Sequence, residues 1–175
     1  MNLIKGIFGS SPGALTNDDI KKLTSETEIK KGDIKKIHKK FVALDKEKKG
    51  YVTINDLVEI PEIEANPLRF HIGQYLSNGS KNESIGFEKF LKLIDIFKNK
   101  KIEEQTKFMF DLFDFDKDGK ISSEDMLVNF KLLLGNSLAE DQLKEIVEKT
   151  IIEYSTDQKF ITREDFDKIL NEAQL

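Results

Sequence analysis

The sequence predicts an all-α fold that is built from repeated helix–loop–helix units. Only 3 prolines and 10 glycines interrupt the 175 residues, which favours long helices. One β-branched residue follows the polar loop of each unit, at spacings of 33, 36 and 40 residues. These residues are Val52, Ile85, Ile121 and Ile161, and five positions after them come Leu57, Phe90, Met126 and Phe166. Regular spacing of this size is typical of repeated supersecondary units.

Caps and apolar periodicity place the first elements. Thr16 and Asp19 have the spacing of a capping box, so a helix should begin at this point. Apolar residues recur at helical spacing over 34–44, with lysines between them, which predicts a second helix. This pattern breaks at Gly50, and a short β-prone segment follows at 51–54.

The four units should form two pairs. A lysine-rich stretch at 98–101 separates the first two units from the last two. We therefore expect a flexible N-terminal segment over 1–16, an N-terminal lobe over 17–97 and a C-terminal lobe over 98–175. Within each lobe, the β-branched residues of the two loops should form a short two-stranded β ribbon.

Composition excludes several classes of protein. The chain has no cysteine, which rules out a disulfide scaffold, a thiolate zinc site and a cysteine nucleophile. No apolar run approaches the roughly 18 residues of a membrane span, and the start lacks a secretory signal, so a cytoplasmic location is expected. A formal net charge of -4 argues against nucleic acid as the main partner.

The loop at 114–125, DFDKDGKISSED, has the EF-hand calcium pattern. Hard divalent cations bind six to eight oxygens, and alternate residues of a curled loop can turn their oxygens inward. Gly119, at loop position 6, permits the sharp turn. The predicted ligands are Asp114, Asp116, Asp118, the backbone carbonyl of Lys120, Ser122 and Asp125. The alternative is a solvated acidic turn that caps a helix without binding an ion.

Position 12 of this loop departs from the usual pattern, because Asp125 stands where glutamate normally supplies two oxygens. Aspartate is one methylene shorter, so it should supply one oxygen and lower the coordination number toward six. A sixfold site suits Mg²⁺ better than Ca²⁺. We expect a cation here, Ca²⁺ with Mg²⁺ as a possible occupant of the same site.

The other three loops have lost ligands, so loop three should be the one competent site. Loop one, 45–56, has Lys49 at position 5, where a lysine ammonium replaces the charge of the cation. Loop two, 78–89, ends on Lys89, and loop four, 154–165, has Lys159 in place of the glycine.

Capping explains the acids that these loops keep at position 12. A hydroxyl at position 9 and an aspartate at position 12 have the spacing of a capping box for the exiting helix. Such a box stabilises the helix without any metal, so a lone acid at position 12 does not indicate calcium binding. The pairs are Thr53 with Asp56, Ser122 with Asp125, and Thr162 with Asp165.

Several further motifs resemble the family of calcineurin B and the calcineurin B homologous proteins. Ile60-Pro61-Glu62 followed by Asn66-Pro67-Leu68 resembles its IPE...NPL segment, and residues 134–138 with 142–152 resemble the linker and helix after its third hand. The resemblance covers about residues 31–170. It implies four EF-hands in two paired lobes. It also implies a regulatory subunit of a calcium/calmodulin-activated Ser/Thr phosphatase.

A partner helix is implied by the same resemblance. Members of the family hold an amphipathic helix of the phosphatase catalytic subunit in a hydrophobic groove, and the homologous proteins hold a cytosolic helix of a membrane transporter. The run at 131–135, KLLLG, has more apolar surface than one helix face can bury internally, which also favours a partner helix. The candidate groove residues are Leu127, Phe130, Leu132, Leu133, Leu134 and Leu138. The alternative for each of them is a place in the core.

Other functions have less support. The family usually begins Met-Gly for myristoylation, but position 2 here is Asn2, so no N-myristoylation is expected. A cation buffer is disfavoured because one loop alone looks competent. An enzyme is not expected, because His38 and His71 have no nucleophile pattern near them and should be solvated or packed side chains.

Overall fold

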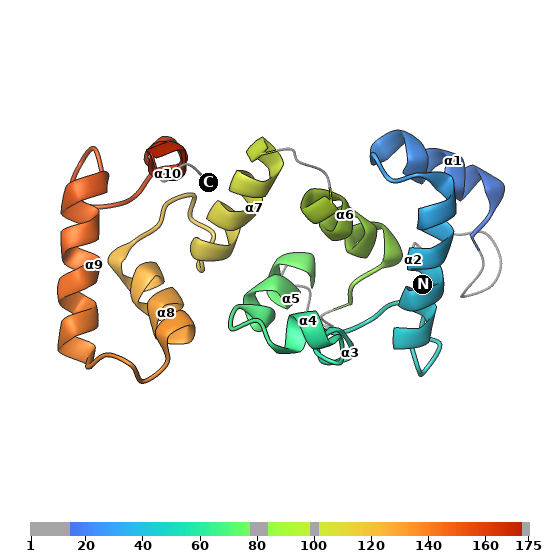
Figure 1. The fold of residues 1–175 in the computed structure, drawn as a ribbon, viewed down its shortest axis with the longest axis horizontal. Helices are drawn as coiled ribbons and strands as arrows, with labels where there is room; N and C mark the ends of the chain where they lie inside the picture. Colours follow the sequence, from blue (N-terminus) through green and yellow to red (C-terminus); the bar gives the residue numbers. More distant parts are fainter. Residues whose placement is uncertain (1–14, 78–83, 99–101, 173–175) are drawn as a thin grey trace, which may run out of the picture. The chain divides into compact units, whose positions relative to one another are not determined.

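The computed structural model describes residues 15–77, 84–98 and 102–172, and it is predominantly helical (Figure 1). The predicted flexible segment at 1–16 therefore lies almost wholly outside the described residues, as does the first half of loop two. The helices are α1 (Asn17–Glu26), α2 (Lys31–Leu44), α3 (Ile54–Leu57), α4 (Pro61–Glu64), α5 (Arg69–Ser77), α6 (Phe87–Lys98), α7 (Ile102–Phe113), α8 (Ser123–Leu134), α9 (Glu140–Tyr154) and α10 (Arg163–Glu172). The all-α prediction is confirmed for this part of the chain.

The chain divides into two compact units. The described residues of the first unit are 15–65 with 76–77 and 84–98, and those of the second are 66–75 with 102–172. Most of α5 therefore belongs to the second unit, although α4 before it and α6 after it belong to the first.

Helix starts follow the capping boxes that the sequence contains. The Thr16 hydroxyl accepts a hydrogen bond from the Asp19 N–H at 3.1 Å, and the Asp19 carboxylate accepts one from the Thr16 N–H at 2.9 Å. The same reciprocal pair begins α3 with Thr53 and Asp56. Ser122 with Asp125 and Thr162 with Asp165 also form this pair. All four predicted capping boxes are confirmed.

In the first unit, α2 packs against both α1 and α6. Ile34 and Phe41 of α2 are buried, as their helical spacing predicts. The Phe41 ring meets Phe87 and Phe90 of α6, with ring centroids 5.4 and 5.5 Å apart. Aromatic contacts of this kind bury a large apolar surface, and their edge-on or tilted geometry adds to the stability of the packing.

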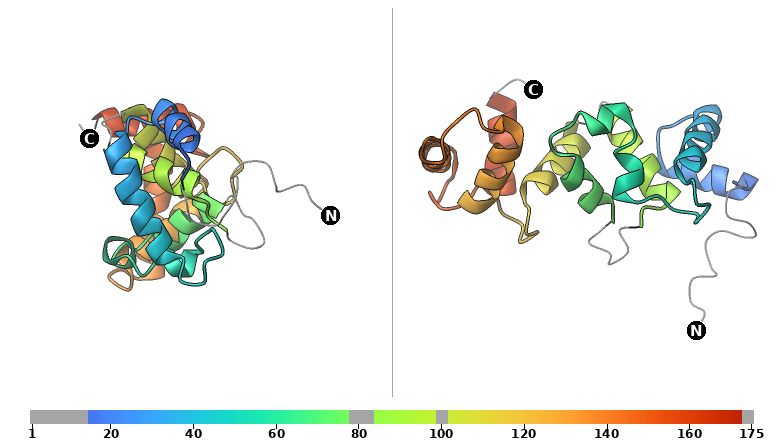
Figure 2. Two further views of the ribbon diagram at one scale, coloured as in Figure 1. Left: turned by 90° about the vertical axis from the view of Figure 1, so that its right-hand side faces the viewer. Right: turned by 90° about the horizontal axis from the view of Figure 1, so that it is seen from below.

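In the second unit, the four helices α7, α8, α9 and α10 form a ring of contacts, each packing on the next and α10 closing onto α7 (Figures 1 and 2). Their apolar side chains meet in one core. The buried members are Phe110, Ile121, Met126, Val147, Ile151, Ile161 and Phe166. The β-branched and large apolar residues that mark units three and four in the sequence thus lie together in this core.

Two isolated antiparallel bridges join the loops in pairs. Val52 pairs with Ile85 in the first unit, and Ile121 pairs with Ile161 in the second. Each bridge consists of two backbone hydrogen bonds, of 3.0 and 2.8 Å in the first unit and 3.0 Å each in the second. Each pairing is limited to this single bridge in the ranges described.

Among the helices that the structure describes, none is long and apolar enough to cross a membrane.

Candidate metal centre

Loop three lies between the end of α7 and the start of α8, and its first residue organises its backbone. The Asp114 side chain is buried, and its two carboxylate oxygens accept hydrogen bonds from the N–H groups of Asp118 (3.1 Å) and Gly119 (3.0 Å). Gly119 has φ +87°, a conformation that glycine adopts at little cost. The sharp turn predicted at position 6 is therefore present.

The turn brings three carboxylates together. Asp114, Asp116 and Asp118 each have an oxygen within 4.8 Å of the oxygens of the other two. Burial raises the pKa of Asp114, and the hydrogen bond from Gly119 opposes that rise. Carboxylate oxygens are the ligands that hard divalent cations prefer, and like charges this close repel each other without a cation. The acidic cluster can therefore hold a metal ion, and these three residues fit a Ca²⁺ or Mg²⁺ centre.

Asp125 and Ser122 make a different set of contacts. One oxygen of the buried Asp125 carboxylate accepts hydrogen bonds from the N–H (2.9 Å) and hydroxyl (2.7 Å) of Ser122. The other accepts the Phe115 N–H at 3.0 Å. Asp125 therefore caps α8 and holds the start of the loop with the same carboxylate. The ammonium of Lys120 lies 4.6 Å from the centroid of the Phe160 ring, on the neighbouring loop.

Two residues that sequence reasoning missed also shape this loop. The amide nitrogen of Asn129 donates to the carbonyls of Phe113 (3.0 Å) and Asp125 (2.8 Å), which ties the two ends of the loop together. Its side chain is fully buried, and an asparagine at a core-facing helix position was the signal that could have found it. The Lys117 ammonium donates to the backbone carbonyl of Asp111 in α7. No pattern in the sequence predicts this contact.

An aromatic contact links α5 to loop three. The His71 ring is buried and packs on Phe115, with centroids 5.0 Å apart. Tyr75, one turn later, meets Phe108 of α7 edge-on at 4.9 Å. Burial lowers the pKa of His71, and the positive charge of Lys117 lowers it further. His71 is therefore a packed, neutral side chain beside the loop.

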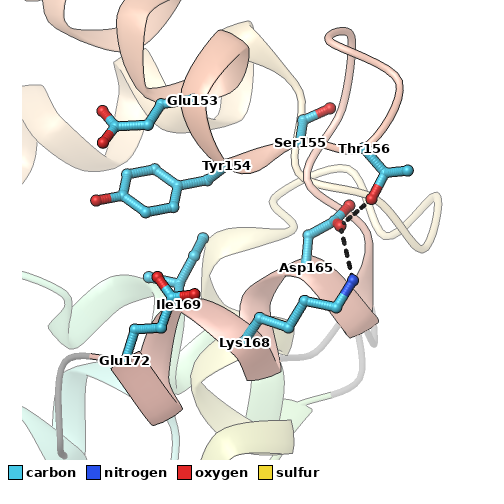
Figure 3. A pocket seen from close by; sticks show the side chains of 8 residues that line it. All are labelled: Glu153, Tyr154, Ser155, Thr156, Asp165, Lys168, Ile169 and Glu172. Carbon is cyan, nitrogen blue, oxygen red and sulfur yellow. Dashed lines mark hydrogen bonds and ion pairs between the residues drawn. The ribbon is translucent and has the colours of Figure 1, made fainter.

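In loop four, the side chains at positions 3 and 12 contact each other directly, although these positions supply ion ligands in the EF-hand pattern. Figure 3 shows Asp165 between Thr156 and Lys168, at an open hollow beside the end of α9. The Thr156 hydroxyl donates to one Asp165 oxygen at 2.6 Å, and the Lys168 ammonium lies 3.8 Å from the same oxygen. The Thr162 N–H and hydroxyl donate to the other oxygen at 3.1 and 2.7 Å.

These hydrogen bonds determine how Asp165 titrates. Its carboxylate is only 2% exposed, and burial favours the neutral acid. The hydroxyl donors outweigh burial and lower the pKa of Asp165 to about 2. The carboxylate of loop four thus stays charged without a metal.

The candidate groove residues divide into two groups. Leu127 and Phe130 are half-buried and pack against the core of the second unit. At the end of α8, Leu132, Leu133 and Leu134 are each about 40% exposed. Leu138, just after α8, is half-buried. Among the candidate groove residues, the exposed apolar surface is therefore concentrated in these three consecutive leucines.

Comparison with known proteins gives one consistent result. No family model matches the chain. Calcineurin B of Naegleria gruberi is 32% identical over 172 residues, which cover 96% of each chain. Calcineurin B of Candida glabrata is 30% identical over 83% of each chain. Human calcineurin B type 2 is 30% identical over 145 residues, 82% of this chain and 85% of its own.

The first of these relatives matches nearly the whole chain, and the other two match more than four fifths of it. The resemblance seen in the sequence motifs is thereby confirmed. The chain belongs to the calcineurin B family.

Proposed function

We propose that this protein is a non-catalytic regulatory subunit of a Ser/Thr protein phosphatase, with four EF-hands and one divalent-cation site. It binds an amphipathic helix of the catalytic subunit in a hydrophobic groove. The observation that carries the proposal is the match of 32% identity to a calcineurin B over 96% of both chains. Because the match extends over 96% of both chains, we infer that this chain shares the surface with which the relative meets its partner.

The three exposed leucines of α8 support the partner helix. Their neighbours Leu127 and Phe130 face the core, so the helix already uses one apolar face internally. Leu132, Leu133 and Leu134 keep apolar surface that the fold does not bury, and burial of that surface against a partner would favour the complex. The surface formed by Leu132, Leu133, Leu134 and Leu138, together with the half-buried Leu127 and Phe130, is our candidate groove.

Loop three supplies the cation site in this proposal. Asp114, Asp116 and Asp118 are the charged ligands, and the Lys120 carbonyl, Ser122 and Asp125 complete the shell. Ca²⁺ is the proposed ion, with Mg²⁺ as a competitor, because an aspartate at position 12 favours fewer ligands. Asp125 must release its hydrogen bond to Phe115 or share that oxygen in order to coordinate the ion.

The four hands form two pairs in this proposal, in an N-terminal lobe over 17–97 and a C-terminal lobe over 98–175. The bridges Val52–Ile85 and Ile121–Ile161 support this pairing, since each joins the eighth residues of two successive loops. Residues 66–75, which include most of α5, group with the second unit. We infer that this first helix of hand two also stabilises hand three.

An adaptor that binds a cytosolic helix of a membrane transporter is the alternative function for the same groove. The names of the relatives favour the phosphatase, since the three given above are all calcineurin B proteins. The two functions require different partners for one surface, so a binding experiment separates them.

Co-expression with a calcineurin catalytic subunit tests the proposal. We expect a stable complex that co-purifies, and we expect Leu133→Glu with Leu134→Glu to abolish it. Ile152→Glu is the matched control, because Ile152 is an apolar residue that is 59% exposed on the neighbouring helix α9. Failure of the wild-type chain to form this complex, together with binding to a transporter helix, would replace the phosphatase with the adaptor function.

A further inference from the structure

Loop one has the backbone of an ion-binding loop, although its ligands are incomplete. The Asp45 carboxylate accepts hydrogen bonds from the N–H groups of Lys49 (2.8 Å) and Gly50 (2.6 Å). Asp114 does the same with positions 5 and 6 of loop three. Gly50 has φ +82° where Gly119 has +87°. The first half of loop one is therefore folded in the same way as that of loop three.

The difference between the loops is at position 5, where loop three has Asp118 and loop one has Lys49. The Lys49 ammonium lies 3.2 Å from a Glu47 oxygen and 3.9 Å from an Asp56 oxygen. Glu47 and Asp56 are loop positions 3 and 12, and both positions supply ion ligands in this pattern. The ammonium also lies 5.3 Å from the centroid of the Tyr51 ring. Lys49 thus places a positive charge between two carboxylates that a metal ion would otherwise join.

This arrangement is specific to one lysine of the loop. The Lys49 side chain is 25% exposed, whereas Lys46 reaches out of the loop and pairs with Glu59 at 2.7 Å. Lys48, at position 4, has φ +55° and forms no ion pair with these carboxylates among the contacts of the described residues. The three lysines look alike in the sequence, but in the structure position 5 is the one that joins the carboxylates at positions 3 and 12.

We propose that loop one is a cation site whose occupant is the chain's own Lys49 ammonium. Hand one is then held in its ion-bound arrangement at every calcium concentration, because the cation is covalently attached. A lysine ammonium is charged at neutral pH, and the two carboxylates at 3.2 and 3.9 Å hold it in the loop. A second consequence is that the site is latent: an oxygen ligand in place of the ammonium leaves a shell that a divalent ion can fill.

The test removes loop three first, so that its result does not depend on the cation site in the proposed function. The full chain with Asp114→Ala and Asp116→Ala is the background. Into it we would introduce Lys49→Asp, and Lys48→Asp as the matched control, which makes the same charge change one residue earlier. An aspartate tolerates the positive φ at position 48 better than most residues do.

Terbium(III) is the probe, because it binds calcium sites and its luminescence is excited through a nearby tyrosine. Tyr51, at position 7 of loop one, is the reporter. We expect Lys49→Asp to gain one saturable terbium site that calcium displaces, and Tyr51→Phe in the same chain to remove the luminescence while calorimetry still detects the site. Lys48→Asp should stay at the level of the background.

Two outcomes would overturn the proposal. No gain of terbium binding in Lys49→Asp would mean that the ammonium does not occupy a cation site. An equal gain in Lys48→Asp would mean that the change in net charge, and not the position of the lysine, causes the binding. Circular dichroism shows whether each variant folds. If Lys49→Asp does not fold, Lys49→Asn takes its place, since it adds an oxygen without a charge, and absence of any site in that variant counts against the proposal in the same way.

Discussion

The hydrogen bonds around Asp165 predict a measurable dependence of stability on pH. Its pKa is lowered from 3.8 to about 2 in the folded chain. Each unit of pKa difference corresponds to about 1.4 kcal/mol, so the ionised carboxylate contributes on the order of 2 kcal/mol to the free energy of unfolding. Because the folded pKa is depressed, this contribution is present above about pH 4 and is lost as the pH falls toward 2.

Asp165→Asn removes the titrating group while keeping its shape. At pH 7 the variant should be less stable than the wild type by about 2 kcal/mol, and the difference should shrink to roughly half at pH 3. Urea unfolding followed by circular dichroism at pH 7, 4 and 3, in the presence of a chelator, measures both values. Thr156→Val is the companion change, since it removes the hydroxyl that donates to Asp165 at 2.6 Å and should cost about 1 kcal/mol.

A difference between wild type and Asp165→Asn that stays constant from pH 7 to pH 3 would refute this reasoning. The loss would then come from packing or from the shape of the amide, and not from an ionised carboxylate held by hydroxyl donors.

Three further predictions concern loop three. Asp114→Ala with Asp116→Ala should abolish high-affinity binding of divalent cations, and calorimetry of the wild type should give one ion per chain; a higher stoichiometry would show that other loops bind. Asp125→Glu should raise the affinity for Ca²⁺ and its preference over Mg²⁺, because the longer side chain can chelate with both oxygens; equal or weaker calcium binding would mean that the loop is adapted to aspartate. Asn129→Ala should lower the free energy of unfolding by about 1–3 kcal/mol in urea titrations, because the carbonyls of Phe113 and Asp125 lose the buried side-chain amide that donates to both; an unchanged midpoint would contradict the bridge across the loop.

Local patterns in the sequence were sufficient for much of the fold. The capping pair Thr16 and Asp19 begins a helix where the spacing predicts it. Ile121 meets Ile161 because both occupy the eighth position of their loops. Such features depend on the position of a residue within its own repeat, so the pattern alone was enough to predict them.

The side-chain contacts of the site required the structure. The sequence predicts Asp125 both as a metal ligand and as the capping partner of Ser122, but it does not show that the second carboxylate oxygen accepts the Phe115 N–H. The sequence also cannot show which of the three lysines in loop one lies near the carboxylates of Glu47 and Asp56. Nor does any local pattern predict that α5 packs on loop three through His71, because that contact joins residues far apart in the chain. These contacts depend on tertiary packing.

The most direct test of the proposed function is a calorimetric titration of the full chain with a peptide of the amphipathic helix from a calcineurin catalytic subunit. Under the proposals made above, hands one and four are held by the chain's own side chains, through Lys49 and Thr156. We therefore expect that one ion in loop three does not by itself open or close the groove. We predict saturable binding with one peptide per chain in calcium, and an affinity that falls by only a modest factor in chelator. Absence of saturable binding in calcium would contradict the role as a phosphatase subunit. Complete loss of binding in chelator would contradict the proposal that the helices of hands one and four keep their arrangement without calcium.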